Sequence, residues 1–188
     1  MALQLLQRNA GLPVTLAEAR ERVRLDDTMG EAELTALIRT AQGAIEKHIT
    51  GTLLPTRWRW SLNAFCELVL PRAPVISVEQ IRYKDTNGAW QTLSPSLYSL
   101  IPCGLGNPSS YLYAASWPAV INEPACITIE FTSGYADAAA IEPELITALL
   151  MLVGHYDKNR EATGEGKSEE ISMGVQFLIG PYMWIEAP

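Results

Sequence analysis

The chain has 188 residues, of which 48% are hydrophobic and 19% are charged. This composition excludes an intrinsically disordered chain, and the length allows a buried core without disulfides or a structural metal. The formal net charge of −7, with 14 Lys and Arg against 21 Asp and Glu, argues against a general binder of polyanions, which needs clustered cations. No segment has the pattern of a secretory signal or the apolar length of a membrane helix, so we expect a soluble protein of a reducing compartment.

The first zone of the chain is predicted to be helical. Thr15 precedes Glu18 by three residues, which is the capping-box arrangement, and a short apolar stripe then runs to Leu25. A second helix is predicted from apolar residues at spacings of three and four between Leu34 and Ile49. We expect Gly51 to cap its C-terminus.

From Pro55 the hydrophobic period changes to two, which is typical of strands. Trp58, Trp60 and Leu62 alternate with polar residues, and Val75 to Lys84 is a second strand with a slip between Val78 and Ile81 that indicates a bulge. Asn87-Gly88 predicts a hairpin turn. Further strands are expected at 90–93, 97–101, 110–113 and 126–132. The close spacing of turn signals favours a compact antiparallel sandwich or barrel.

Helical character returns after Gly134. Pro143 is suited to the first turn of a helix, and the segment from Leu145 to Tyr156 is apolar nearly all round, so we expect a central helix. Residues 160–172 are polar and predicted to form a loop. The fold class is therefore α+β, with residues 1–54 and 136–188 as one discontinuous helical unit of three to four helices and residues 55–135 as a β unit.

The sequence shows no set of reactive side chains with a catalytic spacing. His48 and His155 have no acid partner at helical spacing, so each is interpreted as structural. Cys66, Cys103 and Cys126 lack the short paired spacings of zinc or redox sites, and we expect buried thiols at the first and last of them.

A cluster of acidic residues lies before and within the start of the second predicted helix. Asp26, Asp27, Glu31 and Glu33 do not follow the calcium-loop pattern and favour a solvated helix start. We therefore expect no enzyme active site, no metal ion and no cofactor.

Arginines and tryptophans alternate in the first predicted strand. Arg57 and Arg59 share one face, and with Trp58, Trp60 and Trp90 they could form a nucleic-acid platform. In an alternating strand, however, the tryptophans point away from the arginines. We therefore expect an aromatic core beneath a charged outer face.

The order of short motifs along the chain is more specific than any one of them. These motifs are Val14–Ala19, Arg24–Asp26, Thr50–Leu53, Leu70–Val75, Ile81–Asp85, Asn87–Gly88, Ser116–Pro118, Ile127–Phe131, Gly134–Tyr135, His155–Tyr156, Asn159–Glu161 and Ile171–Tyr182. In this order the chain, from Pro13 to Tyr182, resembles the head–tail connector (adaptor) proteins of tailed phages. The resemblance is to the subfamily with a β domain inserted in a helical connector core.

The resemblance implies a structural role. Such connectors form a ring beneath the portal, extend the DNA channel and link the capsid to the next neck protein; related ones occur in prophages and gene transfer agents. The implied partners are the portal protein, the next neck, stopper or tail protein, and further copies of the chain. DNA passes through the channel without sequence-specific binding. The implied location is the virion neck, after assembly in the host cytoplasm.

The C-terminal segment is the predicted docking element. It follows a polar stretch and carries much apolar surface, so it either folds back on its own helical core or docks on the portal or a neighbouring subunit. The candidate docking residues are Val175, Phe177, Leu178, Ile179, Tyr182 and Trp184. Because the sequence lacks a long uninterrupted apolar surface helix, we expect weak self-association of the isolated chain and a ring that forms on the portal.

Two other functions remain open from the sequence. One is a stand-alone module whose β domain binds carbohydrate or peptide, which requires an exposed aromatic platform on Trp58, Trp60, Trp90 or Trp117. The other is a small hydrolase, which requires a cleft with converging ionisable groups.

Overall fold

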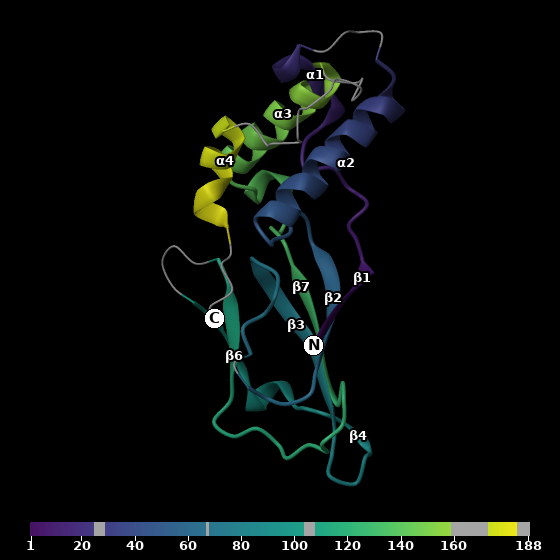
Figure 1. The fold of residues 1–188 in the computed structure, drawn as a ribbon, viewed down its shortest axis with the longest axis vertical. Coiled ribbons are helices and arrows are strands. Elements are labelled where there is room, and N and C mark those ends of the chain that lie inside the picture. The colour runs from purple at the N-terminus through teal and green to yellow at the C-terminus, as the bar shows by residue number, and fades with distance from the viewer. Residues whose placement is uncertain (25–28, 67, 104–107, 159–172, 184–188) are drawn as a thin grey trace, which may run out of the picture. The chain divides into compact units, whose positions relative to one another are not determined.

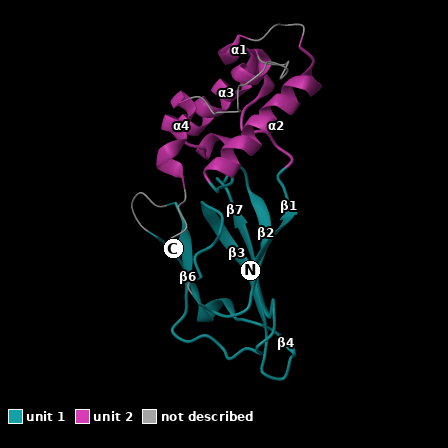
Figure 2. Ribbon diagram, viewed as in Figure 1, with its two compact units in different colours: residues 1–9, 50–136, 184–188 teal, residues 10–49, 137–183 magenta. Residues whose placement is uncertain are grey.

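The computed structural model describes residues 1–24, 29–66, 68–103, 108–158 and 173–183. The chain divides into two compact units (Figure 2). The sheet unit comprises residues 1–9, 50–136 and 184–188, and the helical unit comprises residues 10–49 and 137–183. Helices and antiparallel strands are thus segregated, and the predicted α+β class is confirmed.

The described residues of the sheet unit form a five-stranded and a two-stranded antiparallel sheet (Figure 1). The larger sheet has the strand order β1 (Ala2–Gln7), β2 (Thr56–Leu62), β7 (Ile127–Ser133), β3 (Val75–Lys84) and β4 (Trp90–Thr92). The smaller sheet pairs β5 (Ser99–Pro102) with β6 (Ser110–Tyr113). The strands of the described residues do not close into a barrel, so that variant of the prediction is wrong.

The core of the sheet unit forms where the alternating strands turn their apolar residues to the same side. Trp60 lies opposite Ile129 in the β2–β7 register, and both are buried. Leu112 of β6 belongs to the same cluster, so the two sheets share one core. The predicted alternation of β2 is therefore confirmed.

The bulge and the hairpin predicted for β3 are also present. The register shifts between Val78 and Gln80, and the turn before β4 places Gly88 at a φ of 82°. The Asp85 carboxylate holds this turn, because it accepts hydrogen bonds from the Gln91 side chain and from the amides of Asn87 and Ala89. These bonds, that of Gln91 first, lower the pKa of Asp85 below its ordinary value.

Strand β1 was not predicted, and residues 1–54 were assigned to the helical unit. The structure places residues 1–9 in the sheet unit instead, where β1 pairs with β2 from Ala2–Ser61 to Gln7–Arg57. The segment Ala-Leu-Gln-Leu-Leu-Gln has no β-branched residue and no strict alternation, and its residue types favour helices. Pairing with a distant strand outweighs that local preference.

Besides the short 3₁₀ turn η2 (Ala138–Ala140) before the third helix, the described residues of the helical unit form four α-helices and a terminal 3₁₀ turn. They are α1 (Leu16–Val23), α2 (Glu31–His48), α3 (Pro143–Lys158), α4 (Met173–Ile179) and η3 (Gly180–Tyr182). The Thr15 hydroxyl accepts a hydrogen bond from the Glu18 amide at 3.1 Å, as the capping motif predicted. Gly51 does not cap α2. The helix ends at Ile49, and Thr50 takes the left-handed conformation at a φ of 52°.

Helix α3 is the centre of the helical unit and packs on α1, α2 and α4. The buried residues of these helices include Leu34, Ile38, Ile45, Leu145, Leu149, Leu152, Val153, Val175 and Ile179. Leu37, one of the apolar residues between Leu34 and Ile49 that predicted the second helix, is only half-buried. A Cβ on Gly154 would lie 2.9 Å from Cγ1 of Val23, so glycine allows the close approach of α1 and α3. The loop predicted at 160–172 lies outside the described residues.

Candidate functional site

Within the part of the helical unit that the structure describes, the most exposed apolar side chains lie on α4. Met173 and Phe177 are 86% and 85% exposed and are four residues apart, so they share one helix face. Met151 of α3 adjoins them, because a Cβ on Gly174 would lie 3.2 Å from its terminal methyl group. We call Met151, Met173 and Phe177 the apolar ridge.

The structure divides the predicted docking residues between the core and the surface. Val175 and Ile179 are buried in the helical unit, as the fold-back alternative requires. Phe177 is exposed, whereas Leu178 and Tyr182 are half-buried. Trp184 lies outside the described residues. Of the five that can be placed, Phe177 is thus the side chain most available to a partner.

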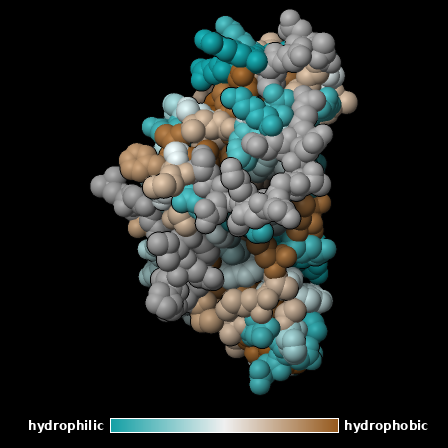
Figure 3. Space-filling view, turned by 45° about the horizontal axis from the view of Figure 1, so that its top comes forward, coloured by the Kyte–Doolittle hydropathy of each residue, from teal (hydrophilic) through white to brown (hydrophobic). Residues whose placement is uncertain are grey.

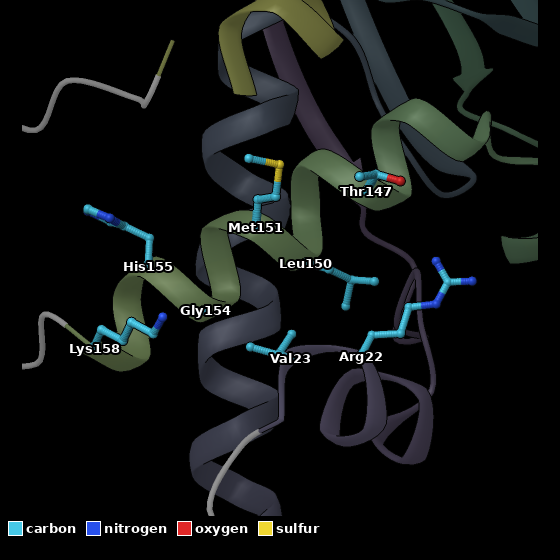
Figure 4. A pocket seen from close by; sticks show the side chains of 8 residues that line it. All are labelled: Arg22, Val23, Thr147, Leu150, Met151, Gly154, His155 and Lys158. Atoms are coloured by element: carbon cyan, nitrogen blue, oxygen red, sulfur yellow. The ribbon is translucent and has the colours of Figure 1, made fainter. Parts of the chain in front are cut away.

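A hollow of about 530 Å³ opens between α1 and α3 and extends to the ridge at Met151. Figure 4 shows its lining residues, with Val23 and Leu150 between Arg22 on one side and His155 and Lys158 on the other. The remaining lining residues are Thr147, Met151 and Gly154. The hollow thus lies where α1 approaches α3 at Gly154, and the described residues that line it are aliphatic, basic or neutral, with no carboxylate among them.

Cationic side chains around this hollow contrast with the rest of the helical unit. The unit has eight Lys and Arg but fifteen Asp and Glu, a formal charge of −7. Arg22 has a salt bridge to Glu18 at 3.8 Å, with side chains that are 58% and 40% exposed, so solvent weakens this pair. An acidic and apolar segment of a partner would match the hollow and the ridge.

Tyr182 joins the end of the C-terminal segment to the start of α3. Its hydroxyl donates a hydrogen bond to Oε2 of Glu144 at 3.1 Å. Burial of the phenol, followed by this bond and the charges of Glu144 and Glu142, raises the pKa of Tyr182 to about 12. The contact holds the turn after α4 on the helical unit.

The outer face of the sheet is charged and largely self-paired, as the alternation of β2 predicted. Arg57 and Arg59 both contact Glu130, at 3.3 and 2.7 Å. Trp60 lies on the opposite, buried face, and Trp58 and Trp117 pack against the core. Trp90 is the most exposed tryptophan of the described residues, and it lies under the cations of Arg82 and Lys84. These four tryptophans therefore form no shared platform for carbohydrate, peptide or bases.

The histidines, cysteines and carboxylates of the described residues do not gather into a metal-binding group. No three His, Cys, Asp or Glu side chains among them lie close enough to hold a metal ion. Cys126 is buried and donates to the Asn63 carbonyl, whereas Cys66 is exposed, so the prediction of a buried thiol at Cys66 is wrong. Cys66 follows the end of β2, beyond the alternating stretch that faces the core. None of the described helices has the length and apolarity needed to cross a membrane.

Comparison with solved structures finds the same fold over the full chain. A chain of the virion of a native gene transfer agent particle has a TM-score of 0.80 and 25% identity, covering 100% of this chain and 98% of its own. A chain from the neck of an empty particle, computed with C6 symmetry, has a TM-score of 0.78 and 25% identity over the same shares. A third, from the neck of a native particle computed with C12 symmetry, has a TM-score of 0.77 at 24% identity. No family model and no curated protein matches the chain.

Proposed function

We propose that this chain is a structural connector of the neck of a phage or gene transfer agent particle. It docks on the portal as a ring, continues the DNA channel and presents a surface to the next neck or tail protein. The observation that carries the proposal is the full-length likeness, at a TM-score of 0.80, to a chain of a gene transfer agent virion. The motif order of the sequence, which resembles head–tail connectors, supports it independently.

Docking on the portal uses the apolar ridge and the adjoining hollow. Val175 and Ile179 anchor α4 on the helical core, which leaves Met173 and Phe177 projecting from a fixed helix. The helix that carries Phe177 is already ordered and the Phe side chain has few torsions to restrict, so Phe177 is suited to be an anchor residue of an interface. The basic side chains of the hollow favour an acidic portal segment beside it.

The two-domain organisation fits this role. We propose that the helical unit is the connector core and that the sheet unit is an insertion between α2 and α3. The portal then contacts the helical unit, and the sheet unit is available to other contacts in the neck.

The DNA channel needs a wall that does not retain DNA. With a net charge of −7 the chain repels phosphates at long range, and two of the sheet's arginines share Glu130. We expect no measurable binding of double-stranded DNA by fluorescence anisotropy at physiological salt. Salt-dependent micromolar binding would contradict this part of the proposal.

The docking test uses the full chain and the portal protein of the same particle. Phe177→Ala with Met173→Ala should weaken portal binding at least tenfold, measured by biolayer interferometry, because the pair supplies the exposed anchor. The fold should be unaffected, since both side chains lie in solvent.

Leu97→Ala is the matched control, because Leu97 is an exposed apolar residue of the sheet unit. It should leave portal binding unchanged. Deleting residues 173–188 should also abolish binding while the sheet unit stays folded, although this deletion removes the core residues Val175 and Ile179 as well. If the double variant binds the portal as well as the wild type, the ridge is not the docking surface.

A further inference from the structure

Strand β1 is an open edge of the five-stranded sheet. Among the described residues its backbone pairs only with β2, so every second amide and carbonyl of Ala2–Gln7 faces away from the sheet. Leu5 lies opposite Trp58 in the register and is still 43% exposed, since no further strand covers it. The backbone of β1 can therefore pair with one more strand, and the exposed Leu5 side chain lies beside that position.

Proteins usually protect such edges with charges, prolines, bulges or very short strands. The opposite edge of the same sheet shows these devices: β3 has two register shifts and the exposed Glu79, and β4 has three residues. In the smaller sheet, β5 ends at Pro102. β1 has six residues with no charge and no proline, and its one register shift lies near its end, between Leu5 and Gln7.

The charge distribution indicates what covers this edge. The sheet unit carries six basic and six acidic residues, whereas the helical unit carries a formal charge of −7. Copies of the helical unit repel one another, but copies of the neutral sheet unit can approach without a long-range electrostatic cost. In a ring of identical chains, contact through the sheet units is therefore favoured.

We propose that β1 is a subunit contact of the ring, and that its open edge binds a second copy of this chain by adding backbone hydrogen bonds across the interface. The inference rests on the proposed ring, and the C6 and C12 symmetries of the similar neck structures support several copies around one axis. The contact is heterologous: β1 of one copy meets a different surface of the next, as a closed ring requires. Leu5 supplies the apolar part of the contact.

The test uses the pure full-length chain, so that a second copy is the only available occupant. Backbone amide shifts are recorded by NMR as the protein concentration rises to about 1 mM, which detects weak contacts. We expect concentration-dependent shifts of the β1 amides and of one further surface. Leu5→Lys should raise the dissociation constant at least tenfold, since it places a charge on the edge.

Leu97→Lys is the control, because it puts the same charge on an exposed leucine of the same unit. It should change the dissociation constant less than twofold. β1 amides that do not move with concentration, or a Leu5→Lys variant that associates like the wild type, would overturn the inference. The NMR experiment contains no portal protein, whereas docking through the ridge is measured with portal. A negative result for the β1 contact can therefore be told apart from a negative result for portal docking.

Discussion

The sheet unit and the helical unit differ in how they balance charge and burial. In the sheet unit opposite charges are matched in number, and several lie in direct pairs such as Arg59–Glu130 and Lys84–Glu123. The helical unit buries a central helix on several sides and carries the entire formal net charge of −7. In the view of Figure 3, apolar side chains reach the surface at several places among hydrophilic ones.

This difference indicates how assembly is controlled. Net like charge keeps free copies apart, so contacts that join them need a specific surface. The neutral unit can supply contacts between copies, while the acidic unit carries the apolar ridge and the basic hollow that we propose for portal docking. One chain can thus combine weak self-association with specific docking.

The largest expected effect is that of Leu149→Ala in the helical core. Leu149 is fully buried, so the cavity should destabilise the unit by roughly 2–5 kcal/mol. Trp58, Trp60, Trp90 and Trp117 all lie in the sheet unit. In a Trp184→Phe background, fluorescence therefore reports on the sheet unit, and circular dichroism at 222 nm reports mainly on the helices.

If the units unfold separately, Leu149→Ala lowers the midpoint followed by circular dichroism more than that followed by fluorescence. We expect this separation in urea. Equal shifts of both midpoints would show that the two units unfold as one cooperative unit. That result would contradict the contrast between them.

Gly134→Ala tests the sheet unit at the end of β7. Gly134 has a φ of 125°, and a Cβ there would lie 2.5 Å from the Leu54 carbonyl carbon and oxygen. The strain should cost about 2–4 kcal/mol. Urea unfolding followed by tryptophan fluorescence measures it, and a loss below about 1 kcal/mol would show that the backbone relaxes easily.

Gly43→Ala in the helical unit should have the opposite sign. Gly43 lies inside α2, and a Cβ there meets nothing within 4 Å. Alanine should therefore stabilise the helical unit by about 0.5–1 kcal/mol, through helix propensity. A raised midpoint at 222 nm with unchanged fluorescence is expected; a lowered midpoint would contradict the packing described for α2.

The smallest effect concerns Asp85 in the β3–β4 turn. Because the pKa of Asp85 is lowered in the folded state, its contribution is present above the unfolded-state pKa and is lost as the pH falls through the folded value. Asp85→Asn should therefore be slightly less stable than the wild type at neutral pH and converge with it in acid. A difference in melting temperature that does not shrink on acidification would contradict this.

Local patterns in the sequence predicted most elements but not the pairing of distant ones. The alternation of β2, the bulge of β3 and the cap at Thr15 depend on neighbouring residues and were confirmed. β1 depends on β2, more than fifty residues away, and its own residues favour a helix.

The candidate site was predicted only in part for the same reason. The apolar residues of the C-terminal segment identified it as a docking candidate. They did not show which of its side chains are exposed. The spacing of Val175 and Ile179 matches one buried helix face and leaves Phe177 outside it, so a helical projection could have separated them. The hollow depends on α1 crossing α3 at Gly154, a long-range contact that no local pattern indicates.

The two ends of the inserted segment meet within the sheet unit. The hydroxyls of Thr52 and Ser133 share a buried hydrogen bond of 2.9 Å, and the Tyr135 amide donates to the Leu53 carbonyl at 3.2 Å. Once the sheet has formed, α2 and α3 are connected as if by a short loop. The entropic cost of bringing α2 and α3 together is then about 2 kcal/mol smaller than for a flexible linker of the same length.

This junction has a consequence for the order of folding during synthesis. All described residues of the sheet unit leave the ribosome before α3 does, so the sheet can form while α1 and α2 still lack their core partner. A sheet folded first would hold the end of α2 beside the point from which α3 emerges. The insertion would then act as an internal template for the rest of the molecule.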